Sequence, residues 1–200
     1  MKIVVLANDA AFNYITQLNP VINWVRVPAA DSFSEHPDAG AFFDLTQNAA
    51  LHEHPDMNKP LFLNSVIHPL PAGKKAVRIN GWEGFLQNDT WEVAGAMSEA
   101  YTNILGALNK KMILCADEPG FIAARIIAMI INEAYFAKGE GVSTEAEIDT
   151  AMKLGTNYPY GPFEWAQKIG TQQLYALLQE LSKQDGRYQP APLLIKTVTG

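Results

Sequence analysis

Cysteine, basic residues and long apolar runs are all scarce in this sequence. The one cysteine, Cys115, cannot form an internal disulfide, so nothing requires an oxidising compartment. Fifteen Lys and Arg against 21 Asp and Glu give a formal net charge of −6, and no basic cluster occurs. This balance removes the electrostatic basis for binding nucleic acid or an anionic membrane surface. The longest apolar stretch, residues 120–137, contains Arg125, Asn132 and Glu133, so we expect no membrane span.

The remaining composition is that of a globular protein. Hydrophobic residues make up 48% of the chain and charged residues 18%, which supplies a core and rules out disorder for most of the chain. The length of 200 residues suits one large domain or two small ones. The apolar run at residues 3–7 is too short for the hydrophobic region of a signal peptide, which favours a cytoplasmic location.

The first half of the chain has the pattern of an α/β domain. Helical spacing of apolar residues predicts helices at residues 10–18 and 98–108. Strands alternating with helices favour a mostly parallel sheet. Short apolar runs bounded by turn residues predict strands at residues 1–7, 22–27, 41–45, 60–67, 76–79, 90–93 and 111–115.

The second half has an all-α pattern. Helices are predicted at residues 121–138, 144–154, 162–168 and 171–183. Asp117 is expected to cap the first of them, and the domains are expected to span residues 1–115 and 116–200. Helix 121–138 is apolar almost all round, so we expect a second subunit to cover part of it in a homodimer.

Five runs in the second half carry a family resemblance. Residues 117–125 read Asp-Glu-Pro-Gly-Phe-Ile-Ala-Ala-Arg, and residues 132–134 read Asn-Glu-Ala. Residues 147–149 read Glu-Ile-Asp, followed by Pro-Tyr-Gly-Pro-Phe-Glu at 159–164, and residues 187–194 read Arg-Tyr-Gln-Pro-Ala-Pro-Leu-Leu. In this order and spacing they resemble the C-terminal domain of the 3-hydroxyacyl-CoA dehydrogenases, of the 3-hydroxybutyryl-CoA dehydrogenase type. The resemblance implies a Rossmann-like NAD-binding domain, here shortened, before a dimerising helical domain that forms one wall of an acyl-CoA cleft.

The dinucleotide loop departs from that family. Such a loop needs glycines after the first strand, so that backbone N–H groups can approach the pyrophosphate. The matching positions here are Ala7, Asp9 and Phe12. Asp9 is expected to repel the pyrophosphate and to cap the following helix itself, and Phe12 is expected to fill the space between strand and helix. We therefore expect no bound NAD and no other cofactor.

The catalytic positions implied by the resemblance also differ. Asn80 stands where the family has its general-base histidine, and Val66 where it has a substrate-contacting serine. The glutamate that pairs with that histidine matches Glu92, which is expected to orient no partner once the histidine is gone. Asn80 has no proton-accepting group useful near neutral pH. The sequence therefore predicts a non-catalytic dimeric relative that keeps the fold and an acyl-CoA-like ligand.

Two enzymatic alternatives stay open. One is an active NAD-dependent 3-hydroxyacyl-CoA dehydrogenase. The other is a different reaction in the same cleft, for instance on an acyl thioester, with His68 or Glu92 as the base.

Two further candidates have plainer interpretations. His52 and His54, with Asp56 nearby, could form a metal cluster, but histidines two apart in a polar loop are more often ordinary loop residues. Cys115 ends an apolar strand and is expected to be a core residue.

Overall fold

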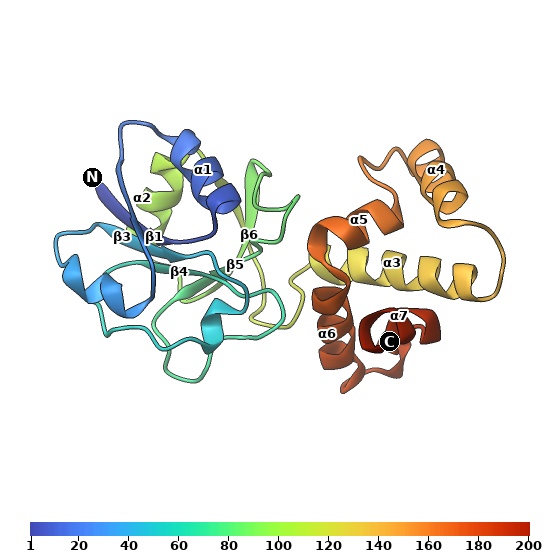
Figure 1. Cartoon of the computed structure of the whole chain (residues 1–200). Coiled ribbons are helices and arrows are strands. Elements are labelled where there is room, and N and C mark those ends of the chain that lie inside the picture. The colour runs from blue at the N-terminus through green and yellow to red at the C-terminus, as the bar shows by residue number, and fades with distance from the viewer. The chain divides into compact units, whose positions relative to one another are not determined.

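The computed structural model describes all residues from 1 to 200, and they form two compact units. The first spans Met1–Phe121 and the second Ile122–Gly200 (Figure 1). The sequence places the boundary earlier, after Cys115. Residues 116–121 lie with the first unit because a buried arginine of the sheet holds them there, as described below.

The first unit is built on one seven-stranded sheet, in the order β2-β1-β3-β4-β5-β6-β7. Neighbouring strands from β2 to β5 are parallel, β6 is antiparallel to β5, and β7 is parallel to β6. All seven predicted strands are confirmed. Their bounds are Lys2–Leu6 (β1), Asn23–Val27 (β2), Ala41–Asp44 (β3), Leu61–Asn64 (β4), Val77–Ile79 (β5), Thr90–Gly95 (β6) and Lys111–Leu114 (β7).

The two faces of this sheet are covered differently. Alternate strand residues point to opposite faces, so Ile3 and Val5 pack with one core cluster and Val4 with the other. The first face is covered by α1 (Asp9–Leu18) and α2 (Glu99–Ala107), which lie on the same side of the sheet (Figure 1). The second face is covered by the short 3₁₀ helices η1 (Asp31–Glu35) and η2 (Ala49–Leu51). The predicted α/β class is confirmed, as a reduced Rossmann-like sheet.

The second unit is all-helical, as predicted, and is centred on α3 (Ala123–Gly139). This helix contacts α5 (Pro162–Ile169), α6 (Thr171–Ser182) and α7 (Pro192–Thr199), and α4 (Glu145–Thr156) contacts α5 (Figure 1). The sequence prediction missed α7, whose short run follows two closely spaced prolines; Pro192 in its first turn is compatible with a helix start.

The last residues of the first unit are held by Arg78 of β5, whose side chain is fully buried. Its Nε donates to Asp117 Oδ1 at 2.5 Å, and its terminal nitrogens donate to the carbonyls of Ser65 and Glu118. The ring of Phe121 lies 4.5 Å from the guanidinium carbon. Burial lowers the pKa of Arg78, while the Asp117 carboxylate opposes that shift. The expectation that Asp117 caps the next helix is wrong, because its carboxylate is committed to this arginine.

Two residues of the quoted motifs pin the helical unit together. Asn132 of α3 donates to Gln189 O at 2.9 Å and accepts from Ala191 N at 2.8 Å. Asp149 of α4 accepts from the N–H groups of Phe163 and Glu164 at 2.8 and 3.2 Å, which caps α5 from a neighbouring helix. The side chains of Asn132 and Asp149 are both buried, so these two motif residues have a structural role.

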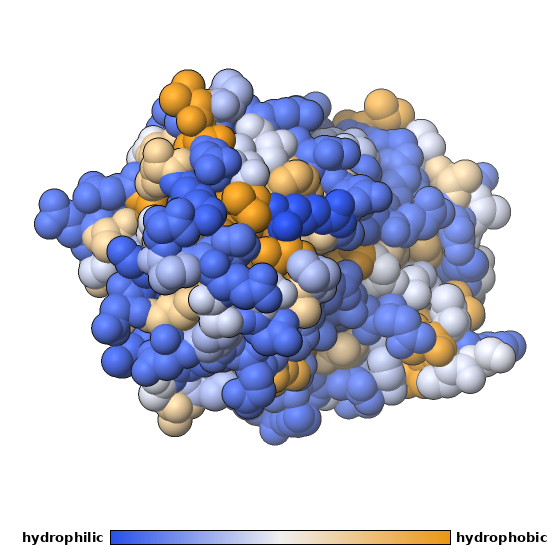
Figure 2. Space-filling model, turned by 60° about the vertical axis from the view of Figure 1, so that its left-hand side comes forward, coloured by the Kyte–Doolittle hydropathy of each residue, from blue (hydrophilic) through white to orange (hydrophobic).

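The face of the chain in Figure 2 is mostly hydrophilic, with apolar side chains (orange) in small groups among hydrophilic ones (blue). No helix has the length and apolar character needed to cross a bilayer. The cysteine expectation is wrong: Cys115 follows the exposed strand β7 and is itself partly exposed.

The Asp149 cap generates a stability prediction. Asp149→Ala leaves the buried N–H of Phe163 without an acceptor, so we expect a loss of about 1–3 kcal/mol in the free energy of unfolding. Urea denaturation followed by circular dichroism measures it. Glu133→Ala, at an exposed position of α3, is the matched control and should change stability by less than about 0.5 kcal/mol. Equal stabilities for the two variants would contradict the cap.

Candidate active site

The parallel strands β1, β3, β4 and β5 end at one edge of the sheet, where folds of this class bind ligands. Each strand end carries polar side chains, and each has a different arrangement. The ends of β1 and β3 border the point where the strand order reverses, because the chain runs from β1 out to β2 and back to β3.

At the end of β1, the place of a dinucleotide loop is filled by the side chain of Arg26 from β2. Its Nε and one terminal nitrogen donate to Ala7 O at 3.1 and 2.8 Å. Its other terminal nitrogen pairs with Asp9 Oδ1 at 2.5 Å, and its guanidinium lies 5.5 Å from the centre of the Phe12 ring. The groups that would face a pyrophosphate are therefore already engaged within the chain.

The helix that follows is capped by Asn8, not by Asp9. The Asn8 side chain accepts from Ala11 N at 2.8 Å, which uses one of the N–H groups that a phosphate would take. The expectation that Asp9 supplies this cap is wrong, because Arg26 holds its carboxylate to the side. Phe12 packs half-buried against the core cluster that contains Ile3 and Ile15. These residues do not fit a dinucleotide.

At the end of β5, Asn80 and Glu92 form a buried pair. Asn80 directly follows β5, and β6 runs antiparallel beside it, which brings Glu92 opposite. Asn80 Nδ2 donates to Glu92 Oε2 at 2.8 Å, and the exposed fractions of the two residues are 2% and 9%. The expectation that Glu92 orients no partner is wrong, because it accepts from Asn80.

This pair differs from an imidazole–carboxylate pair in one chemical respect. An imidazole that donates to a carboxylate keeps a basic nitrogen on its far side, whereas Asn80 keeps an amide oxygen there. That oxygen, Oδ1, is buried without a hydrogen-bond partner, and such an acceptor costs about 1–3 kcal/mol. The Asn80 amide therefore has no basic nitrogen with which to replace an imidazole as a proton acceptor.

At the end of β4, side chains hold neighbouring backbone in place. Asn64 Oδ1 accepts from Gly81 N at 3.1 Å, and a Cβ added to Gly81 would lie 2.7 Å from Asn64 Cγ. Ser65 Oγ donates to His68 O at 2.8 Å, which fixes the loop carrying the half-buried His68. Val66 is buried and offers no polar group at the position implied for a serine. The role of His68 as a base stays a prediction.

At the end of β3, Asp44 gathers two histidines. His52 Nδ1 and His54 Nε2 lie 3.1 and 3.0 Å from Asp44 Oδ2. No group of three or more His, Cys, Asp or Glu side chains here has the arrangement of a metal site. The sequence shows both histidines as candidates. Asp44 was not predicted as their partner, although an aspartate that ends an apolar strand is a recognisable signal.

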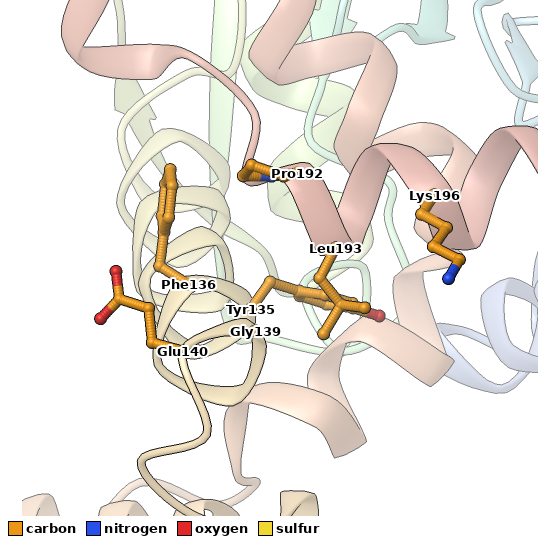
Figure 3. Close-up of a pocket in the computed structure, with 7 residues that line it drawn as sticks. All are labelled: Tyr135, Phe136, Gly139, Glu140, Pro192, Leu193 and Lys196. Carbon is orange, nitrogen blue, oxygen red and sulfur yellow. The ribbon is translucent and has the colours of Figure 1, made fainter.

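The helical unit has a pocket of its own, of about 410 Å³, between the end of α3 and the start of α7. Its walls are mainly apolar, with Glu140 on the α3 side and Lys196 on the α7 side (Figure 3). The volume is in the range of small-molecule sites. The lining residues are Tyr135, Phe136, Gly139, Glu140, Pro192, Leu193 and Lys196.

The motif residues that hold the helices of the second unit together lie within a match to a known family of domains. The model of the 3-hydroxyacyl-CoA dehydrogenase C-terminal domain matches residues 120–199. The helical unit is therefore similar to the C-terminal domain of the 3-hydroxyacyl-CoA dehydrogenases. This agrees with the resemblance drawn from the sequence, and the match covers the helical unit.

Similar proteins are longer than the region they share with this chain. 3-Hydroxyadipyl-CoA dehydrogenase of Escherichia coli is 48% identical over 87 residues, which are 42% of this chain and 18% of that protein. 3-Hydroxybutyryl-CoA dehydrogenase of Bradyrhizobium diazoefficiens is 40% identical over 105 residues, 52% of this chain and 36% of that protein. The chain thus covers well under half of either relative.

The fold likeness extends over both units. The crystal structure of Mycobacterium tuberculosis FadB2 superposes with a TM-score of 0.77, covering 98% of this chain and 92% of that one at 13% sequence identity. At that identity the likeness shows the fold alone. The sheet of this chain therefore has the same fold as the sheet of that structure.

The close approach of Gly81 to Asn64 generates a prediction for the site. Gly81→Ala forces its Cβ against Asn64, so we expect a loss of about 1–3 kcal/mol in unfolding free energy from overpacking. Thermal unfolding measures it. Gly106→Ala in α2 is the matched control, because its Cβ meets nothing within 4 Å and should stabilise the helix by about 0.5–1 kcal/mol. If Gly81→Ala is as stable as the parent chain, the packing argument is wrong.

Proposed function

We propose that this chain is a non-catalytic, dimeric relative of the 3-hydroxyacyl-CoA dehydrogenases that binds an acyl-CoA-like ligand. The observation that carries the proposal is the buried Asn80–Glu92 pair, which keeps the geometry of a donor–carboxylate pair without a basic nitrogen. The fatty-acid setting of the family and the matched helical domain support the ligand class.

The first strand end supports the absence of NAD chemistry. The family resemblance implies NAD, but the Arg26 side chain, the Asp9 carboxylate and the Asn8 cap occupy the interactions that a pyrophosphate needs. A ligand would have to displace a guanidinium with three hydrogen bonds and would then meet a carboxylate. No hydride-transfer step is derived for this chain.

The runner-up is an enzyme with the same fold and another proton acceptor. His68 lies in the loop after β4, where Ser65 Oγ donates to its carbonyl oxygen. An active NAD-dependent dehydrogenase is the other alternative. A titration with NADH and acetoacetyl-CoA separates it from the proposal.

Support for the dimer comes from α3. Ile126 on this helix is 52% exposed, and Ile122, one turn earlier, is 50% exposed. Large apolar side chains half-exposed on one helix face are typical of protein contact sites. A second copy of this chain is the occupant we propose, through the helical domain.

The ligand proposal predicts a split result in calorimetric titration. NADH should give no saturable binding heat, and acetoacetyl-CoA should bind saturably, with no loss of NADH absorbance when both are present. Asn80→His is the matched variant: it places an imidazole beside Glu92 but leaves the filled nucleotide loop, so it should also fail to oxidise NADH. NADH oxidation by the parent chain above background would return the dehydrogenase to first place.

The dimer proposal predicts a position-specific effect in sedimentation velocity. The parent chain should sediment as a dimer at micromolar concentration, and Ile126→Lys should be monomeric because it buries a charge in the contact. Leu154→Lys, at an 82% exposed apolar position on α4, is the control and should stay dimeric. A monomeric parent chain would contradict the dimer, and a monomeric Leu154→Lys alone would move the contact to α4.

A further inference from the structure

The cluster at the end of β3 is built around a buried carboxylate with four donors. Asp44 is fully buried, and its Oδ1 accepts from the backbone N–H and the hydroxyl of Thr46. Its Oδ2 accepts from His52 Nδ1 at 3.1 Å and His54 Nε2 at 3.0 Å. Burial raises the pKa of Asp44, but the hydrogen bonds from His54, Thr46 and His52 outweigh it and lower the pKa overall. Asp44 is therefore a fixed anion.

His54 is held between three partners. Its Nδ1 lies 3.0 Å from Lys74 Nζ and 2.9 Å from His52 O, and its Nε2 lies 3.0 Å from Asp44 Oδ2. With only 1% of its side chain exposed, the His54 ring is fixed between these groups and is not open to a ligand.

His52 differs because one side of its ring is open. Its Nδ1–H points to Asp44, which leaves the lone pair on Nε2. Nε2 makes no hydrogen bond, and 41% of the side chain is exposed. The ring is also stacked on His54, with centroids 6.3 Å apart. An imidazole with one nitrogen held by a buried carboxylate and the other facing outward has the arrangement of a general base.

The surroundings of His52 narrow the ligand class. Asp44 and Lys74 balance each other in charge, and the nearby Glu53 and Asp56 add negative charge. Such a site disfavours phosphate and other anions and suits an uncharged electrophile. Thr46 cannot be the nucleophile, because its hydroxyl donates to Asp44 on the Nδ1 side of the ring. Water is the remaining nucleophile.

The cluster of Asp44 with His52 is separate from the Asn80–Glu92 pair. Asp44 ends β3 and Asn80 follows β5, with β4 between them. At about 4.8 Å per strand spacing the two sites lie on the order of 10 Å apart. Asp44 lies beside β1, where the strand order reverses and ligand crevices form.

We propose that His52, positioned by Asp44, is the general base of a second site that hydrolyses small uncharged carboxylic esters or thioesters. His52 Nε2 takes a proton from water as the water oxygen bonds to the acyl carbon. The tetrahedral adduct then expels the alcohol or thiol, which receives that proton from His52. One water is consumed, one carboxylic acid and one alcohol or thiol are formed, and no oxidant or reductant takes part.

The test uses the whole chain and the hydrolysis of p-nitrophenyl acetate. His52→Gln should lower the second-order rate constant by about 100-fold or more, within the range of a general base. His36→Gln, a histidine held by Lys2 outside the cluster, is the matched control and should leave the rate unchanged. An unchanged rate in His52→Gln overturns the proposal. A loss in His68→Gln instead also overturns it and assigns the base to that histidine.

A second measurement needs no variant. Nitrogen-15 chemical shifts of the His52 ring should show the tautomer with hydrogen on Nδ1 and a bare Nε2, because Asp44 accepts from Nδ1. The opposite tautomer would remove Asp44 as a positioning residue and overturn the proposal. Acyl-CoA binding, measured as above, is independent of both results, so either idea can fail while the other stands.

Discussion

The buried guanidinium of Arg78 is the interaction on which the arrangement of the sheet edge depends. It joins strand β5 to the loop after β4 through Ser65 and to the chain that leaves the sheet through Asp117 and Glu118. A charge fully buried in this way needs every donor satisfied, since one lost partner leaves an uncompensated ion. Within the first unit, the loop after β4 and the segment after β7 are thus both held by this one side chain.

The polar groups at this edge are bonded to one another within the chain. At the end of β1, Arg26 donates to the carbonyl of Ala7 and Asn8 accepts from a backbone N–H of the next helix. At the end of β5, Asn80 donates to Glu92. An imidazole–carboxylate pair is nevertheless present, two strands away, as His52 with Asp44. The chain thus has the fold of the structures it superposes on, with polar pairs at its strand ends that differ from those the resemblance implies.

The sequence predicts the elements well where the signal is local. Short β-branched runs closed by Pro or Gly mark the strands, and apolar residues at helical spacing mark most helices. It fails where the deciding partner is distant. Asp117 has the local pattern of a helix cap, but its partner Arg78 lies 39 residues earlier. Asn8 and Asp9 are adjacent candidates for the same cap, and Arg26, 17 residues later, decides between them.

The sequence by itself determined the resemblance of the helical unit and the division into an α/β and an all-α half, because both reside in patterns of near neighbours. Only the tertiary structure decided what the polar residues at the strand ends do. It paired Asn80 with Glu92, filled the nucleotide loop with Arg26, and aimed His52 and His54 at Asp44. The pairing of strands sets these contacts, and strand order is a long-range property that local propensity does not encode.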